Sequence, residues 1–122
     1  MPITEAGIER AVTAFLHNNY GIRHIKTGKN GWPDQEYLLG KGASFYVEFK
    51  KPGEEPSKLQ RERLDWLCEN YYACGWADNF QDAVAMVLQE FIRIHKPPLN
   101  ELKNFTNIAR AAKEIRYSDY GC

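Results

Sequence analysis

Residues 45–50, Phe-Tyr-Val-Glu-Phe-Lys, constrain the fold of this chain more than any other segment. Large apolar residues at 45, 47 and 49 alternate with Tyr46, Glu48 and Lys50, and a period of two is typical of a β-strand. A second strand is expected at 35–40, and a short turn at 41–44 favours antiparallel pairing of the two. The chain is therefore expected to contain a sheet whose faces need cover from helices.

The rest of the pattern supplies those helices and two further strands. Thr4 is a suitable N-cap for an amphipathic helix at 4–19, and Ser57 for a helix at 58–70. Strands are expected at 22–27 and 71–77, a strongly apolar helix at 80–92 and a last helix at 100–116. The predicted class is α/β, a mixed sheet flanked by helices in the order α-β-β-β-α-β-α plus a C-terminal helix. The 80–92 helix is apolar nearly all round, so we expect it in the core or against another subunit.

Composition places the chain among folded globular proteins. It has 122 residues, 43% of them hydrophobic, and a formal net charge of zero. Bases are in excess in residues 20–63 and 93–122, whereas residues 64–92 contain acids and no base, so a basic face can form on a neutral molecule. No apolar run is long enough for a membrane helix, and the N-terminus lacks the pattern of a secretory signal. Three cysteines without a Cys-x-x-Cys pair favour thiols in a cytoplasmic protein.

Glu48 and Lys50 indicate chemistry, because residues two apart on a strand project to the same side. Pro33 favours an extended entry to the 35–40 strand, directly before Asp34. In the expected hairpin Asp34 and Glu48 lie at the same end, where two carboxylates suit a divalent metal ion. Lys50 beside that ion would stabilise developing negative charge or orient a water molecule. The alternative is an ordinary Glu–Lys pair on an exposed strand face.

Other kinds of site find less support in the sequence. The histidines and cysteines do not have the spacing of a common zinc site. Residues 28–31, Gly-Lys-Asn-Gly, lack the spacing of a phosphate-binding P-loop, and no Gly-x-Ser-x-Gly motif is present. Trp32, next to Pro33, is suited either to stacking on a nucleic-acid base or to covering the end of the hairpin.

Three segments carry a resemblance to a known family. Gly31-x-Pro33-Asp34 comes first, residues 45–53 (FYVEFKKPG) follow, and residues 56–60 (PSKLQ) come next. In this order and at this spacing they resemble the VRR-NUC family, the virus-type replication-repair nucleases of the PD-(D/E)xK superfamily. The likeness extends over about residues 4–84. It implies a restriction-endonuclease-like fold and a metal-dependent endonuclease, of a phage or prophage type similar to Holliday-junction resolvases.

The resemblance also implies a set of site residues. Asp34, Glu48 and the Phe49 carbonyl would bind Mg²⁺ or Mn²⁺, Lys50 would be the catalytic lysine, and Gln60 would lie near the active site. The first helix of the family offers one more acid to the metal, and here Glu5 and Glu9 are both candidates, four residues apart on one helix face. We favour Glu9, with Glu5 as a carboxylate that stabilises the helix N-terminus.

The resemblance further implies DNA as the substrate, branched or otherwise structured, and a homodimer that cuts two strands as a pair. Lys51, Lys58 and Arg61 flank the expected site and are candidates for binding DNA phosphates. Residues 1–92 would form the nuclease domain, and residues 93–122 a helical extension packed on that domain or on the dimer partner. The alternatives are a monomeric nicking or flap endonuclease and a non-catalytic DNA-binding module that retains the fold.

Overall fold

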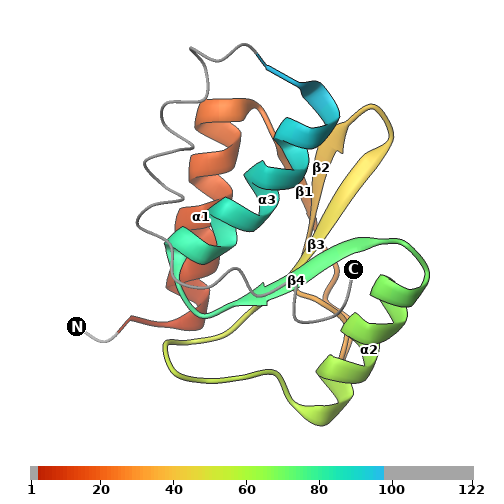
Figure 1. Cartoon of the computed structure of the whole chain (residues 1–122). Coiled ribbons are helices and arrows are strands. Elements are labelled where there is room, and N and C mark those ends of the chain that lie inside the picture. Colours follow the sequence, from red (N-terminus) through yellow and green to blue (C-terminus); the bar gives the residue numbers. More distant parts are fainter. Residues whose placement is uncertain (1–2, 98–122) are drawn as a thin grey trace.

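A computed structural model describes residues 3–97, in which helices cover both faces of one four-stranded sheet (Figure 1). The order of elements agrees with the sequence prediction over this range. The elements are α1 (Glu5–Tyr20), β1 (Arg23–Lys26), β2 (Gln35–Gly40), β3 (Ala43–Phe49), α2 (Lys58–Glu69), β4 (Ala73–Ala77) and α3 (Phe80–His95). None of these helices is both long and apolar enough to cross a membrane.

The sheet has the strand order β1-β2-β3-β4 and is mixed, as expected. β1 pairs with β2 and β2 with β3 in antiparallel fashion, whereas β3 and β4 are parallel and are connected through α2. Gln35 lies opposite Val47 in the β2–β3 hairpin. This register brings the start of β2, just after Asp34, next to the end of β3, where Glu48 is located.

The two faces of the sheet carry separate apolar clusters. α1 and α3 lie together over one face, and α2 lies over the other (Figure 1). The larger cluster, under α1 and α3, includes Phe45, Val47 and Phe49 of β3. The smaller cluster lies under α2 and includes Trp76 of β4, with Tyr46 of β3 packed against it. Because β3 is covered on both sides, the alternative of an exposed Glu–Lys pair is wrong for Glu48, whose exposed fraction is only 1%.

The two predicted N-caps begin their helices. The Thr4 hydroxyl accepts a hydrogen bond of 3.0 Å from the backbone N–H of Gly7. Ser57 and Gln60 form a reciprocal capping box at the start of α2, in which each side chain accepts from the backbone N–H of the other. These caps satisfy N–H groups at the ends of α1 and α2 that lie beside the site described below.

Two predictions differ from the structure in detail. α3 continues to His95, beyond the end predicted for this helix at residue 92. β3 ends at Phe49, so Lys50 follows the strand, although its N–H still donates to Ala77 of β4 at 2.9 Å. Cys74 is a free, buried cysteine, as expected for a thiol.

The apolar helix predicted at 80–92 belongs to the core of the chain itself. Ala83, Val84, Met86, Val87 and Leu88 of α3 are all fully buried in the larger cluster. Of the two locations that the sequence left open, the structure thus supports the core. The helix predicted at 100–116, and most of the extension predicted at 93–122, lie outside the described residues.

Candidate metal centre

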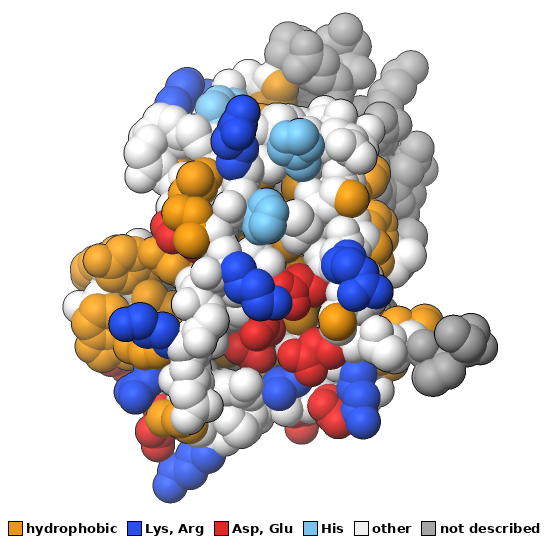
Figure 2. All heavy atoms as spheres, turned by 180° about the vertical axis from the view of Figure 1, so that it is seen from behind, with side chains coloured by type: hydrophobic (Ala, Val, Ile, Leu, Met, Phe, Trp, Pro, Cys, Tyr) orange, Lys and Arg blue, Asp and Glu red, His pale blue; other side chains and the backbone are white. Residues whose placement is uncertain are grey.

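Three carboxylates from separate elements meet at one edge of the sheet. Glu5 is the first residue of α1, Asp34 precedes β2, and Glu48 is the penultimate residue of β3. One carboxylate oxygen from each lies within 4.8 Å of the other two. Figure 2 shows acidic side chains gathered near the centre of one face, with Lys and Arg side chains around them. The prediction that Asp34 and Glu48 share one end of the hairpin is confirmed.

Backbone hydrogen bonds fix Asp34 between two strands. Its side-chain Oδ2 accepts from the N–H of Phe49 at 2.8 Å, and its carbonyl accepts from the N–H of Thr27 at 3.1 Å. The loop before it approaches α2 closely at Gly31, which has a φ of 81°. A Cβ at this glycine would lie 2.7 Å from Cδ2 of Leu59, so any other residue would have to displace that side chain, and the positive φ favours glycine in its own right.

Gln60 links the start of α2 to the carboxylates. Its Nε2 donates to Glu48 Oε2 at 3.2 Å, while its Oε1 accepts from the backbone N–H of Ser57 at 2.8 Å. One amide group therefore completes the capping box and orients an acidic side chain. The resemblance implied that Gln60 lies near the active site, and the structure places its amide group against Glu48.

Burial and mutual repulsion raise the pKa values of the three acids. Burial, then the charge of Asp34 and a hydrogen bond with it, raises the pKa of Glu48 to about 9. Burial also raises the pKa of Asp34, although the Phe49 N–H bond opposes this effect, and burial raises the pKa of Glu5. The positive charge of Lys50 lowers the pKa values of Glu48 and Glu5.

This arrangement fits a hard divalent cation. Mg²⁺ and Mn²⁺ prefer oxygen ligands, and the cluster offers three carboxylates with oxygens within 4.8 Å of one another. Carboxyl groups with raised pKa values gain most when a positive charge arrives, because the charge relieves both repulsion and desolvation. Lys50 alone does not compensate the cluster, since the pKa of Glu48 stays raised despite it.

The structure brings Glu5, and not the favoured Glu9, next to Asp34 and Glu48. Glu9 is buried, with an exposed fraction of 8%, and its Oε2 is bonded to Lys26 Nζ at 3.1 Å and to Gln35 Nε2 at 2.5 Å. It is not among the three acids that converge. Glu5, one turn earlier, lies closer to the helix end that faces Asp34 and Glu48. The two acids share one helix face, so their spacing alone did not separate them.

The predicted DNA-binding residues lie outside the cluster. Lys51 pairs with Glu54 at 3.0 Å and Arg61 with Glu55 at 3.1 Å, whereas Lys58 is exposed on the first turn of α2. The structure brings other cations closer to the acids. A cavity of about 340 Å³ beside the cluster is lined by Lys26, Lys29, Asp34 and Gln60, among others.

Sequence reasoning missed Lys26 and Lys29 as site residues. Their only signal was the excess of basic residues in 20–63, which does not single out any position. Lys26 forms a hydrogen bond with Glu9 that raises its pKa, and the charges of Asp34 and Glu5 act in the same direction. Lys26 therefore lies within electrostatic reach of the three-carboxylate cluster.

Comparison with known proteins supports the fold. Protein-family models give no match to the sequence, and curated proteins give none either. Among solved structures, the chain is similar to one described as a VRR_NUC domain protein, with a TM-score of 0.59 and 19% sequence identity. The likeness covers 77% of this chain and 92% of the other. The chain thus has a fold similar to that of this VRR_NUC domain protein, and the predicted α/β class, a mixed sheet flanked by helices, is confirmed.

Proposed function

We propose that this protein is a metal-dependent endonuclease that hydrolyses phosphodiester bonds in branched or otherwise structured DNA. The observation that carries the proposal is the convergence of Glu5, Asp34 and Glu48, with Lys50 beside them, on a fold similar to that of a VRR_NUC domain protein. A fold supports many functions, so the argument rests on the site. Three acidic side chains this close together, of which Glu48 is buried and Glu5 and Asp34 are partly buried, are costly to keep ionised unless a cation balances their charge.

Glu5, Asp34 and Glu48 would hold Mg²⁺ or Mn²⁺, and the carbonyl of Phe49 is a further candidate ligand. When bound, a divalent cation withdraws charge from phosphate oxygens and lowers the pKa of water. Asp34 keeps its orientation through the N–H of Phe49, and Glu48 through the amide of Gln60. Both acids are therefore already in place before substrate arrives, which lowers the reorganisation needed for the reaction.

The basic residues have two roles in this proposal. Lys50 lies beside the acids, where its ammonium group would stabilise the negative charge that develops on phosphate or orient the attacking water. Lys26 and Lys29, on the cavity next to Asp34, and exposed Lys58 would contact DNA phosphates further from the reacting bond.

Calorimetric titration with Mn²⁺ separates an enzyme from a DNA-binding module that only retains the fold. We expect the wild-type protein to show a binding site that Asp34→Ala abolishes, because this variant removes a carboxylate from the centre of the cluster. Asp65→Ala, which removes an exposed carboxylate on α2, is the matched control and should bind as wild type. Equal Mn²⁺ binding by wild type and Asp34→Ala would favour the non-catalytic module.

The structure also predicts different effects for the two acids of α1. Glu5→Gln should weaken Mn²⁺ binding about tenfold, which corresponds to about 1.4 kcal/mol, because a converging carboxylate is lost. Glu9→Gln should leave the affinity within about threefold, since Glu9 is bonded to Lys26 and Gln35 instead. Titration of both variants tests this order. A larger loss of Mn²⁺ affinity in Glu9→Gln than in Glu5→Gln would indicate that Glu9 is the metal ligand of α1.

A panel of DNA substrates tests the substrate class. Four-way junction, flap, nicked duplex, plain duplex and single strand should be offered with Mg²⁺ or Mn²⁺, and we expect branched forms to be cut in preference to plain duplex. Light scattering of the same preparation separates a Holliday-junction-resolvase-like homodimer from a monomeric nicking or flap endonuclease. A monomer at micromolar concentration would contradict paired cutting by a symmetric dimer.

A further inference from the structure

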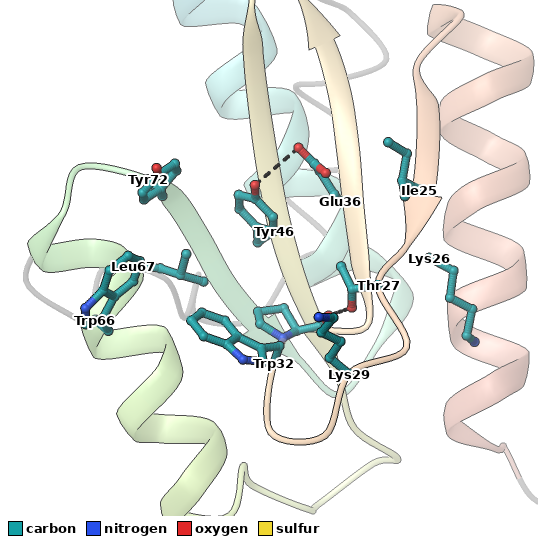
Figure 3. Close-up of a pocket in the computed structure, with 11 residues that line it drawn as sticks. Ile25, Lys26, Thr27, Lys29, Trp32, Glu36, Tyr46, Trp66, Leu67 and Tyr72 are labelled. Atoms are coloured by element: carbon teal, nitrogen blue, oxygen red, sulfur yellow. Dashed lines mark hydrogen bonds between the residues drawn. The ribbon is translucent and has the colours of Figure 1, made fainter.

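An aromatic groove lies beside the metal centre, between α2 and the edge of the sheet formed by β1 and β2. It has a volume of about 570 Å³, within the range of ligand sites. Figure 3 shows Trp32, Trp66, Leu67 and Tyr72 along one wall, with Ile25 and Thr27 across from them. Tyr46 and Glu36 lie between these walls and are joined by a hydrogen bond of 3.2 Å.

The rings of the groove form one continuous set. Trp66 lies edge-on to Trp32, with ring centroids 5.9 Å apart, and nearly parallel to Tyr72, with an interplanar angle of 17°. The guanidinium of Arg63 lies over the Trp32 ring, 5.1 Å from its centroid, and steadies it from the side of α2. Trp66 is nevertheless 49% exposed and Tyr72 47% exposed. Aromatic side chains that are held in place and remain half-exposed are typical of recognition surfaces.

The groove is continuous with the candidate metal centre. Trp32, Thr27, Lys26 and Lys29 line both the groove and the smaller cavity that reaches Asp34. In Figure 3, Lys29 lies close to Trp32, whereas Lys26 extends toward α1. A ligand with rings in the groove would therefore place a negatively charged backbone between these lysines and the acidic cluster.

We propose that the aromatic groove binds unpaired bases of DNA, so that the preferred substrate has a single-stranded segment next to the bond that is cut. This inference rests on the proposed nuclease function for the identity of the ligand. Bases stack on aromatic side chains without sequence preference, and lysines bind the phosphates of the same strand. A perfectly paired duplex buries its bases and has none to offer, so the groove selects flaps and single-strand junctions over continuous duplex.

Fluorescence anisotropy in EDTA measures this binding without cleavage. The probes are a labelled oligothymidylate of about 12 nucleotides, an abasic strand of the same length and a duplex of the same length. Wild type should bind the thymidylate at least tenfold more tightly than the abasic strand, because the two differ only in bases. Trp66→Ala should lose about tenfold for the thymidylate and little for the abasic strand, and Trp66→Phe should recover much of the loss.

Tyr71→Ala is the matched control for the groove. Tyr71 is 98% exposed and precedes Tyr72, but it does not line the groove, so its removal should leave binding unchanged. Tyr72→Ala provides a second groove variant, and thermal melting shows whether each variant is folded. If Trp66→Ala does not fold, Tyr72→Ala carries the test alone.

Several results would overturn the inference. The first is equal affinity for the abasic and the base-containing strand, and the second is an equal loss of affinity in Tyr71→Ala and in the groove variants. The third is a change of solution mass in Trp66→Ala without loss of DNA binding. That result would assign the groove to a second copy of the chain. Failure of the groove inference can be distinguished from failure of the proposed nuclease function. Base-dependent binding without any cleavage would contradict only the nuclease, whereas cleavage without base-dependent binding would contradict only the groove.

Discussion

Replacing Lys50 by Met is expected to lower the rate of DNA cleavage by about 10²–10³-fold, the usual effect of removing one group that stabilises transition-state charge. The methionine keeps most of the apolar stem of the side chain and removes only its charge. Lys50 is held by the N–H bond to Ala77, a backbone contact that the substitution preserves. The fold should therefore persist while the reaction slows.

The same substitution, Lys50→Met, should slow cleavage without weakening Mn²⁺ binding. The Lys50 charge lowers the pKa values of Glu48 and Glu5, so it also repels any other cation that these acids would hold. Lys50→Met should bind Mn²⁺ as tightly as wild type or more tightly. Single-turnover cleavage and Mn²⁺ titration on the same preparations measure the two effects.

Two outcomes would contradict this account of Lys50. Equal cleavage by Lys50→Met and wild type would point to a contaminating nuclease or to a different catalytic group. Loss of Mn²⁺ binding together with cleavage would show that Lys50 organises the acids instead of acting on phosphate. Lys58→Met, which removes an exposed lysine from α2, is a control that should change DNA affinity modestly and leave the chemical step intact.

The sequence predicted the half of the site that depends on local pairing. The alternation in 45–50 and the short turn before it were enough to place Asp34 and Glu48 together, because antiparallel register follows from adjacent strands. The cap at Ser57 was predicted on the same local basis, and the capping box then explains why Gln60 is oriented toward Glu48. The hairpin pairing and the cap involve neighbours along the chain or across one hairpin, whereas the Gln60–Glu48 bond joins α2 to β3.

The other half depends on how helices pack, which local patterns do not specify. Glu5 and Glu9 are equivalent by spacing, and only the position of α1 against β1 gives Glu9 to Lys26 and leaves Glu5 for the cluster. The aromatic groove joins residues 32, 66 and 72 through the packing of α2. The sequence left Trp32 open between base stacking and covering the hairpin, and the structure places it in that groove.

Glu48→Gln is expected to abolish Mn²⁺ binding. Without metal, the stability of this variant relative to wild type is expected to increase as the pH rises. Burial, with the charge of Asp34, raises the pKa of Glu48 from 4.5 to about 9. The unfolded chain therefore releases this proton near pH 4.5, while the folded protein retains it. The contribution of Glu48 to the free energy of unfolding is therefore greatest at low pH and is lost as the pH rises between these two values, by at most about 1.4 kcal/mol per pH unit.

A glutamine removes this dependence while it preserves the local hydrogen bond. Its amide group donates to Asp34 as the protonated acid does, but it does not ionise. The stability difference between Glu48→Gln and wild type in EDTA should thus widen steadily from about pH 5 to about pH 8.5. Glu62→Gln, an exposed acid on α2, should give a curve parallel to that of wild type.

Thermal melting with and without Mn²⁺ completes the argument for a metal centre. Cation binding displaces the proton from Glu48, so Mn²⁺ should stabilise wild type more strongly as the pH rises, in proportion to the cost of ionisation that it removes. Glu48→Gln should not respond to Mn²⁺ at any pH. If the curve of Glu48→Gln in EDTA runs parallel to that of wild type, Glu48 does not retain a proton in the folded protein. The repulsion between the acids would then be relieved by something other than a bound cation.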